Sequence, residues 1–228
     1  MRPVLTLIVQ PRDLLAVAAR TALDRAVASS AVDVVQLRLA DPQATATDLA
    51  VAAAALRVLL DANAARRPAL VVNAPLALVA GAAALDVDGW HVKERELSGD
   101  LAALVRADLQ WGASVHSVDA AQRAARAGAN YLQVGTMFLT KSHPGKTQIE
   151  GPQLLQKIRA DGGCGRVPLV AVGGISTRTQ IAEVVHAGAD GVAVIRAVLE
   201  AADPFEAAIA VRRATQEALV LTARQPRG

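Results

Sequence analysis

The sequence is poor in cysteine and in aromatic residues. Its 228 residues include one cysteine, Cys164, and aromatic side chains make up 2% of the chain. A single cysteine cannot form an intrachain disulfide, and metal sites built on clustered thiolates need several. We therefore expect a reducing, cytoplasmic setting.

The chain also lacks a long hydrophobic run and a block of basic residues. The most apolar stretches, Leu49–Leu60 and Val71–Leu85, are interrupted by Arg57 and Asn73 and are shorter than the ~18 residues of a membrane span. Residues 1–15 lack a basic segment followed by an apolar one, so we expect neither export nor membrane contact. The 24 Lys and Arg residues are scattered against 21 Asp and Glu residues, which argues against a nucleic-acid partner.

Apolar residues are plentiful and follow a repeating pattern. They make up 53% of the chain, and short β-branched runs alternate with alanine-rich segments from end to end. Eight such pairs predict an α/β fold, a (β/α)8 TIM barrel in a single domain. An open doubly wound sheet is the alternative, but its G-x-G-x-x-G turn is missing. The predicted strands are Val4–Val9, Val32–Arg38, Ala69–Asn73, Val87–His91, Gln110–His116, Tyr131–Thr136, Pro168–Val172 and Gly191–Ile195.

Helix starts and ends can also be read from the sequence. Thr177 with Gln180 has capping-box spacing, and Asp203 precedes a proline at the first helical position. Gly128 and Gly188 each end a predicted helix just before a strand, as a left-handed cap would. We assign residues 1–220 to the barrel and residues 221–228 to a polar C-terminal tail.

The last two strands point to an anion. Active sites of barrels lie at the carboxyl ends of the strands. Gly173 and Gly174 follow the seventh strand and precede a capped helix, a geometry that exposes backbone N–H groups to an anion. Val194 and Ile195 close the eighth strand before Arg196. These residues predict a phosphate site, although the glycines alone would also fit a tight turn.

Polar residues on the second and fifth strands complete the candidate site. Ser114 and His116 alternate to the same side of their strand, and an imidazole there suits proton transfer. The alternative is a histidine satisfied by a neighbouring carbonyl. Gln36 and Arg38 fall on the inner face of the second strand, where a guanidinium needs an anion or an acid. Ser117 is expected to cap the next helix.

The other histidines are weaker candidates. His91 ends the fourth strand, and the charged run that follows it is typical of a solvated loop. His143 lies in a long polar loop that could fold over a bound anion. His186 falls at the end of a predicted helix, where an imidazole interacts with the helix dipole.

With these residues the chain resembles the thiamine-phosphate synthase and thiazole tautomerase superfamily over nearly its whole length. The resemblance implies a TIM barrel, a small-molecule thiazole phosphate as ligand and cytoplasmic metabolism. A homodimer is also possible for a member of this family, and the sequence gives no argument for or against one. The matching phrases are Val35–Arg38, Asp88–Val92, Gly112–Ser117, Gly128–Tyr131, Val134–Thr136, Val170–Ile175 and Gly188–Ile195.

Departures from the family pattern distinguish its two branches. The synthase branch joins a pyrimidine diphosphate to thiazole phosphate, and it needs Mg²⁺ and cations to stabilise the departing pyrophosphate. Its Gln-x-Arg-x-Lys pattern has Ala40 in place of the lysine, and its Asn-Asp-Arg pattern here reads Asn73, Ala74, Pro75. Glu96 stands at the position of its second metal acid. These losses favour the tautomerase branch.

We therefore predict a thiazole tautomerase, an isomerase that aromatises a thiazole phosphate carboxylate. The resemblance implies that His116 transfers the proton and that no metal is required. The alternatives are a thiamine-phosphate synthase, a transferase that would use Mg²⁺, and a non-catalytic thiazole phosphate binding protein. The predicted substrate-binding residues are Gln36, Arg38, Ser114, Thr136, His143, Gly173, Gly174, Val194 and Ile195.

Overall fold

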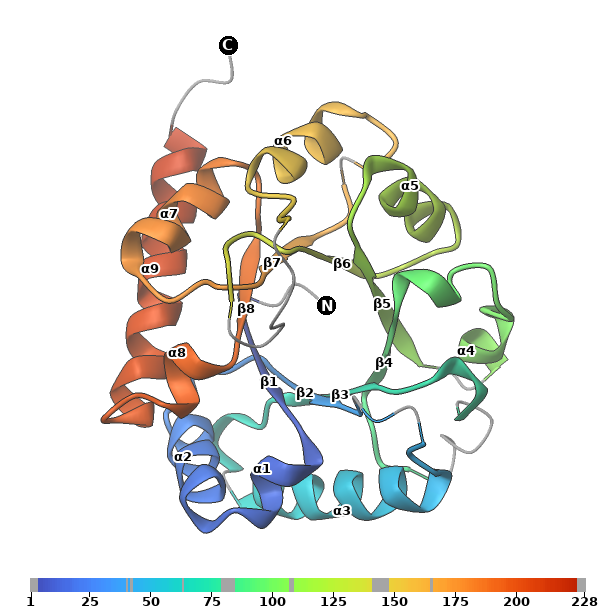
Figure 1. The fold of residues 1–228 in the computed structure, drawn as a ribbon. Coiled ribbons are helices and arrows are strands. Elements are labelled where there is room, and N and C mark those ends of the chain that lie inside the picture. Colours follow the sequence, from blue (N-terminus) through green and yellow to red (C-terminus); the bar gives the residue numbers. More distant parts are fainter. Residues whose placement is uncertain are drawn as a thin grey trace.

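The chain folds into a closed barrel of parallel strands inside a ring of helices (Figure 1). The structure, a computed structural model, describes residues 4–39, 41, 43–62, 64–78, 85–106, 109–140, 148–164 and 166–224. The strands are paired in sequence order, and β8 pairs with β1 to close the sheet. This confirms the predicted single-domain (β/α)8 barrel.

Each strand lies within two residues of its predicted bounds. The largest differences are two residues: β2 and β4 begin two residues later than their apolar patterns, and β6 ends two residues earlier. The strands are β1 Leu5–Val9, β2 Val34–Arg38, β3 Ala69–Asn73, β4 Gly89–Val92, β5 Gln110–Val115, β6 Tyr131–Val134, β7 Leu169–Val172 and β8 Gly191–Val194.

Helices cover the outside of the barrel, and α9 lies against α2 and α7 (Figure 1). The α-helices are α1 Pro11–Leu15, α2 Val17–Ala28, α3 Ala46–Ala62, α4 Ala102–Arg106, α5 Val118–Arg126, α6 Gln153–Ala160, α7 Arg178–His186, α8 Arg196–Leu199 and α9 Pro204–Arg224, with 3-10 turns η1 Ala64–Arg66 and η3 Glu94–Glu96. Helix α9 continues past residue 220, where the sequence analysis starts a polar tail. Within the described ranges, no helix combines the length and apolar character that a membrane span needs.

The predicted caps are present. Ser117 Oγ accepts a hydrogen bond from Ala120 N at 3.1 Å, and Thr177 Oγ1 accepts one from Gln180 N at 3.2 Å. Gly188 adopts a φ of 115°, and a Cβ there would lie 2.7 Å from the Arg159 side chain. A non-glycine residue would therefore be strained and would clash at this helix end.

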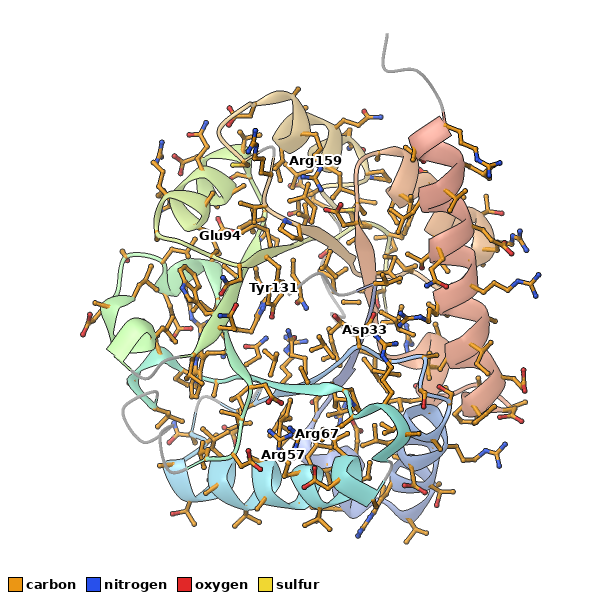
Figure 2. The ribbon with its side chains drawn as sticks, turned by 180° about the vertical axis from the view of Figure 1, so that it is seen from behind. Asp33, Arg57, Arg67, Glu94, Tyr131 and Arg159 are labelled. Atoms are coloured by element: carbon orange, nitrogen blue, oxygen red, sulfur yellow. The ribbon has the colours of Figure 1, made fainter. Side chains whose placement is uncertain are left out.

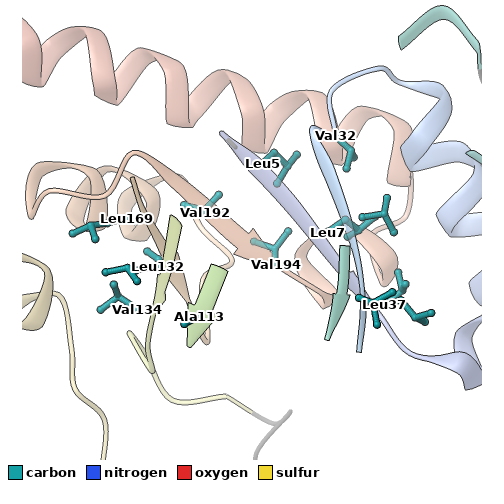
Figure 3. Packing of buried hydrophobic residues seen from close by; sticks show 14 of the residues in the cluster. Leu5, Leu7, Val32, Leu37, Ala113, Leu132, Val134, Leu169, Val192 and Val194 are labelled. Atoms are coloured by element: carbon teal, nitrogen blue, oxygen red, sulfur yellow. The ribbon is translucent and has the colours of Figure 1, made fainter. Parts of the chain in front are cut away.

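Apolar side chains form two layers. The larger layer fills the space between the strands and the helices, and Figure 3 shows part of it, including Leu5, Val192 and Val194. A smaller cluster lies within the barrel, with Ile8 and Val170 among its members. It leaves much of the remaining interior to polar side chains.

A repeated hydrogen-bond pair fixes the register at the amino end of the barrel. The residue just before each even-numbered strand donates its N–H to a carbonyl oxygen of the preceding strand, at 2.7–3.0 Å. The side chain of this residue accepts a hydrogen bond from the N–H of the strand residue whose carbonyl oxygen it binds, at 2.8–3.0 Å. Because the N–H and the carbonyl oxygen of one strand residue both take part, a shift in register would break both hydrogen bonds. The four pairs are Asp33 with Leu5, Asp88 with Leu70, Asn130 with Trp111, and Asp190 with Leu169.

Arginines from the helices bind the three aspartates among these residues. Burial alone would raise the pKa of Asp33, but hydrogen bonds from Arg212 and from the backbone of Leu5 hold that pKa below its usual value. Figure 2 shows Asp33, Arg57 and Arg159, which take part in these ion pairs. The pairs are Arg212 of α9 with Asp33, Arg57 of α3 with Asp88, and Arg159 of α6 with Asp190.

Asp190→Ala should lower the free energy of unfolding by about 2 kcal/mol, because it leaves Leu169 N–H without its acceptor and removes the carboxylate that pairs with Arg159. Asp190→Asn should cost about half as much, since Asn130 shows that an amide can serve at this position. Urea unfolding of the two variants measures both values. An alanine variant within about 0.5 kcal/mol of the parent would contradict this role.

Candidate functional site

A cavity of about 740 Å³ opens at the carboxyl ends of the strands. Its volume suits a small-molecule ligand. Its wall includes inward-facing residues of β1, β2, β3, β5, β6 and β7 and residues of the loops that follow the strands. The lining residues are Ile8, Gln36, Arg38, Asn73, Lys93, Glu94, Arg95, Ser98, Ser114, His116, Arg123, Gln133, Gly135, Thr136, Val172 and Gly173.

Three buried amides line the cavity. Gln36, Asn73 and Gln133 are 1%, 6% and 3% exposed. Asn73 Nδ2 donates to Gln36 Oε1 at 3.5 Å. Gln36 Nε2, Asn73 Oδ1 and Gln133 Nε2 have no hydrogen-bond partner within the part of the chain that the structure describes. Buried polar groups without partners are costly, and a polar ligand in the cavity would offset this cost.

His91, Tyr131 and Ser114 form a hydrogen-bonded chain inside the barrel. His91 Nδ1 lies 3.0 Å from the Tyr131 hydroxyl, and His91 Nε2 lies 2.8 Å from Ser114 Oγ. Figure 2 places Tyr131 within the ring of strands. Gly112 makes room for its ring, because a Cβ at Gly112 would lie 2.3 Å from the Tyr131 ring.

Burial keeps this chain of side chains uncharged. Desolvation, together with the charges of Arg38 and Lys93, lowers the pKa of His91 to about 3. Desolvation also raises the pKa of Tyr131 above its usual value. At neutral pH a neutral imidazole therefore orients the Ser114 hydroxyl, which lines the cavity.

The rim of the cavity carries several positive charges. Arg38, Lys93 and Arg95 line it, and Arg123 reaches it from α5. Burial lowers the pKa of Arg38, which shows that this cation is partly removed from water. Such a group is favourable where an anion meets it.

His116 lies at the same rim and bonds to an acid. Its Nδ1 is 2.6 Å from Glu94 Oε2, and its backbone N–H donates to the same oxygen at 2.8 Å. Its side chain is 43% exposed. The imidazole therefore faces the cavity, as predicted from the strand alternation, but its partner is a carboxylate rather than a carbonyl.

The structure brings together most of the predicted ligand residues. Gln36, Arg38, Ser114, Thr136 and Gly173 all line the cavity.

Gly174, Val194 and Ile195 are not among the residues that line the cavity. Gly174 adopts a φ of 68°, and a Cβ there would lie 2.5 Å from the Phe138 carbonyl oxygen, so it fits the tight-turn alternative. Val194 packs between the strands and the helices, and Ile195 packs on the smaller inner cluster. His143 lies outside the described residues.

The sequence analysis missed the rim after β4 and two of the three amides, Asn73 and Gln133. It interpreted Lys93–Glu96 as a solvated loop, whereas the turn η3 places Lys93, Glu94 and Arg95 on the cavity. A position directly after the fourth strand was the signal available for these residues. Gln133 was detectable only as a polar residue within an otherwise apolar strand.

The low pKa of His91 predicts a loss of stability in acid. An unfolded histidine binds a proton near pH 6.5, whereas folded His91 binds one only near pH 3. Between these values the unfolded state binds more protons, so the free energy of unfolding should fall by about 1.4 kcal/mol per pH unit as the pH decreases.

His91→Gln should remove this contribution, so between pH 7 and pH 5 the variant should lose about 2 kcal/mol less than the parent. Urea unfolding at both pH values measures the difference. His186→Gln, which removes an exposed imidazole from α7, is the matched control. Equal pH dependence in the parent and in His91→Gln would contradict a buried, neutral His91.

Comparisons with known proteins identify the family. The family model described as thiamine monophosphate synthase matches residues 5–198. The thiamine-phosphate synthase of Methanoculleus marisnigri is 40% identical over 196 residues, which cover 84% of this chain and 86% of that protein. The synthase of Geobacillus thermodenitrificans is 38% identical over 137 residues, which cover 60% of this chain and only 61% of that relative's length. The solved thiamine phosphate pyrophosphorylase from Pyrococcus furiosus has a TM-score of 0.72 at 28% identity, over 95% of this chain and 96% of that one.

These findings correct the predicted activity. The prediction of a thiazole tautomerase, an isomerase, is wrong, because these relatives carry the name of the synthase, a transferase. The sequence analysis counted the lost groups at positions 40, 74 and 75 without the cations that Lys93 and Arg95 bring to the rim. The resemblance to the superfamily is confirmed, and the chain belongs to the thiamine monophosphate synthase family.

Proposed function

We propose that this chain is a thiamine-phosphate synthase, which joins a pyrimidine diphosphate to thiazole phosphate and releases pyrophosphate. Family membership supplies the class of reaction. The observation that carries the proposal is one cavity that combines a cationic rim with buried amides, each of which has one polar atom without a hydrogen-bond partner among the described residues. This combination suits a ligand with a polar ring at one end and a diphosphate at the other.

The amides match the edge of an aminopyrimidine. Gln36 Nε2 offers a donor and Asn73 Oδ1 offers an acceptor, and the two side chains are hydrogen-bonded to each other. An aminopyrimidine presents a ring nitrogen that accepts beside an amino group that donates. Hydrogen bonds to this edge would give Gln36 Nε2 an acceptor and Asn73 Oδ1 a donor. A ring without the amino group would bind less tightly, because Asn73 Oδ1 would stay without a donor.

The rim suits the leaving group. In the reaction, the bond between the pyrimidine's methylene carbon and the diphosphate oxygen breaks, and its electron pair leaves with the pyrophosphate. The thiazole nitrogen donates the electron pair of the new carbon–nitrogen bond. Negative charge therefore grows on the departing pyrophosphate, and preorganised cations such as Arg38 and Lys93 stabilise it. Thr136 and Gly173 lie on the same cavity and would hold the thiazole phosphate.

The family resemblance implies Mg²⁺, but the residues present are a poor set of ligands for it. Within the described ranges, no group of three or more His, Cys, Asp or Glu side chains could hold a metal ion. Ala74 occupies the position of the family's aspartate, and Glu94 binds His116. Glu96 accepts from the N–H groups of Leu76 and Lys93. Mg²⁺ prefers carboxylate oxygens, so we assign no step to the ion.

The proposal includes a small-molecule thiazole phosphate as the second substrate and a cytoplasmic location. Neither a nucleic acid nor a membrane is part of it. A homodimer stays a prediction.

Incubation of the chain with the pyrimidine diphosphate and thiazole phosphate should yield thiamine phosphate, detected by its oxidation to a fluorescent thiochrome. Arg38→Met should lower kcat/KM by about 100-fold, because it removes a partly buried cation next to the growing charge. Arg213→Met, which removes an exposed cation from α9, should leave kcat/KM unchanged. Absence of product at every Mg²⁺ concentration would reject the function.

A further inference from the structure

We propose that side chains, rather than a divalent ion, neutralise the diphosphate at this site, so that Lys93, Arg95 and Arg38 bind pyrophosphate without Mg²⁺. This inference rests on the proposed function and concerns its leaving group. It departs from what the family resemblance implies. Three features of the described residues carry it: the charges on the cavity wall, the absence of ion pairs at Lys93 and Arg95, and the hydrogen bonds of the nearby carboxylates.

The charges on the cavity wall are strongly one-sided. Among the residues that the structure describes, Arg38, Lys93, Arg95 and Arg123 line the wall together with one carboxylate, Glu94. Arg123 also pairs with Asp119 on its own helix, at 3.1 Å, so part of its charge is compensated. The remaining excess suits a ligand that carries several negative charges.

Lys93 and Arg95 differ from Arg123 in their charged surroundings. Within the part of the chain that the structure describes, neither Lys93 nor Arg95 forms an ion pair. The negative charge of Glu96 still raises the pKa of Lys93, without direct contact between the two side-chain charges. Lys93 is half-buried, and desolvation lowers its pKa despite Glu96. A partly desolvated ammonium without a paired acid is costly, and a bound phosphate oxygen would offset that cost.

The two carboxylates of the turn η3 already accept hydrogen bonds from the protein. Glu94 Oε2 receives two hydrogen bonds from His116, at 2.8 and 2.6 Å. Glu96 Oε1 accepts from Leu76 N at 2.9 Å, and its Oε2 faces Lys93 N at 3.4 Å. Glu96 therefore shapes the turn that places Lys93 and Arg95 on the cavity. A metal would have to displace these bonds and enter a positively charged rim.

Calorimetric titration of the full chain with inorganic pyrophosphate tests the inference. The Kd measured in excess EDTA should lie within about threefold of the Kd measured in Mg²⁺. Lys93→Met with Arg95→Met should weaken binding in EDTA by about 30-fold or more, since two charge-assisted contacts are lost. Arg213→Met lowers the net charge by one unit away from the cavity and should bind like the parent.

Two results would overturn the inference. One is pyrophosphate binding that requires Mg²⁺. The other is a double variant that binds as tightly as the parent in EDTA. A thermal unfolding scan shows whether the double variant folds; if it does not, Arg95→Met alone, at an exposed position of η3, should weaken binding by about fivefold. An unchanged Kd in that single variant would then count against the inference.

The measurement also separates this inference from the proposed function. Pyrophosphate binding in EDTA without any thiamine phosphate formation would reject the function and leave the inference standing. Thiamine phosphate formation together with strictly Mg²⁺-dependent pyrophosphate binding would reject the inference alone.

Discussion

The site depends on the repeated hydrogen-bond pairs at the amino end of the barrel. Asp33, Asp88, Asn130 and Asp190 each join the start of an even-numbered strand to the preceding strand through two hydrogen bonds. Because side chains alternate along a strand, a shift of one residue would turn the interior set toward the helices. These hydrogen-bond pairs therefore decide that Gln36 and Arg38 of β2 face the cavity and that His91 of β4 faces the interior of the barrel.

The interior of the barrel is divided between apolar and polar groups. Ile8, Val170 and Ala193 pack on one side, whereas Gln36 and His91 belong to a polar set. Part of that set is satisfied internally, as the chain from Tyr131 through His91 to Ser114 shows. The unpartnered amides and the cationic rim are the part left for a ligand. This division accounts for both ends of the proposed substrate.

Local patterns predict the fold well and the site only in part. Strands and caps depend on nearest neighbours along the chain, so apolar spacing and residues such as Ser117 and Thr177 were sufficient to predict them. The burial of His91 depends on Tyr131, two strands away, and could not be read from its own strand. A charged run gives the same signal whether it faces water or a cavity, so Lys93 and Arg95 were assigned to solvent. Counting missing family groups without these cations led to the wrong enzyme class.

A crystal structure with thiamine phosphate and pyrophosphate tests the central claim most directly. The account predicts the pyrimidine edge against Gln36 and Asn73, with pyrophosphate oxygens in direct contact with Lys93 and Arg95. Pyrophosphate held through a metal ion on Glu94, or a pyrimidine bound away from the amides, would contradict it.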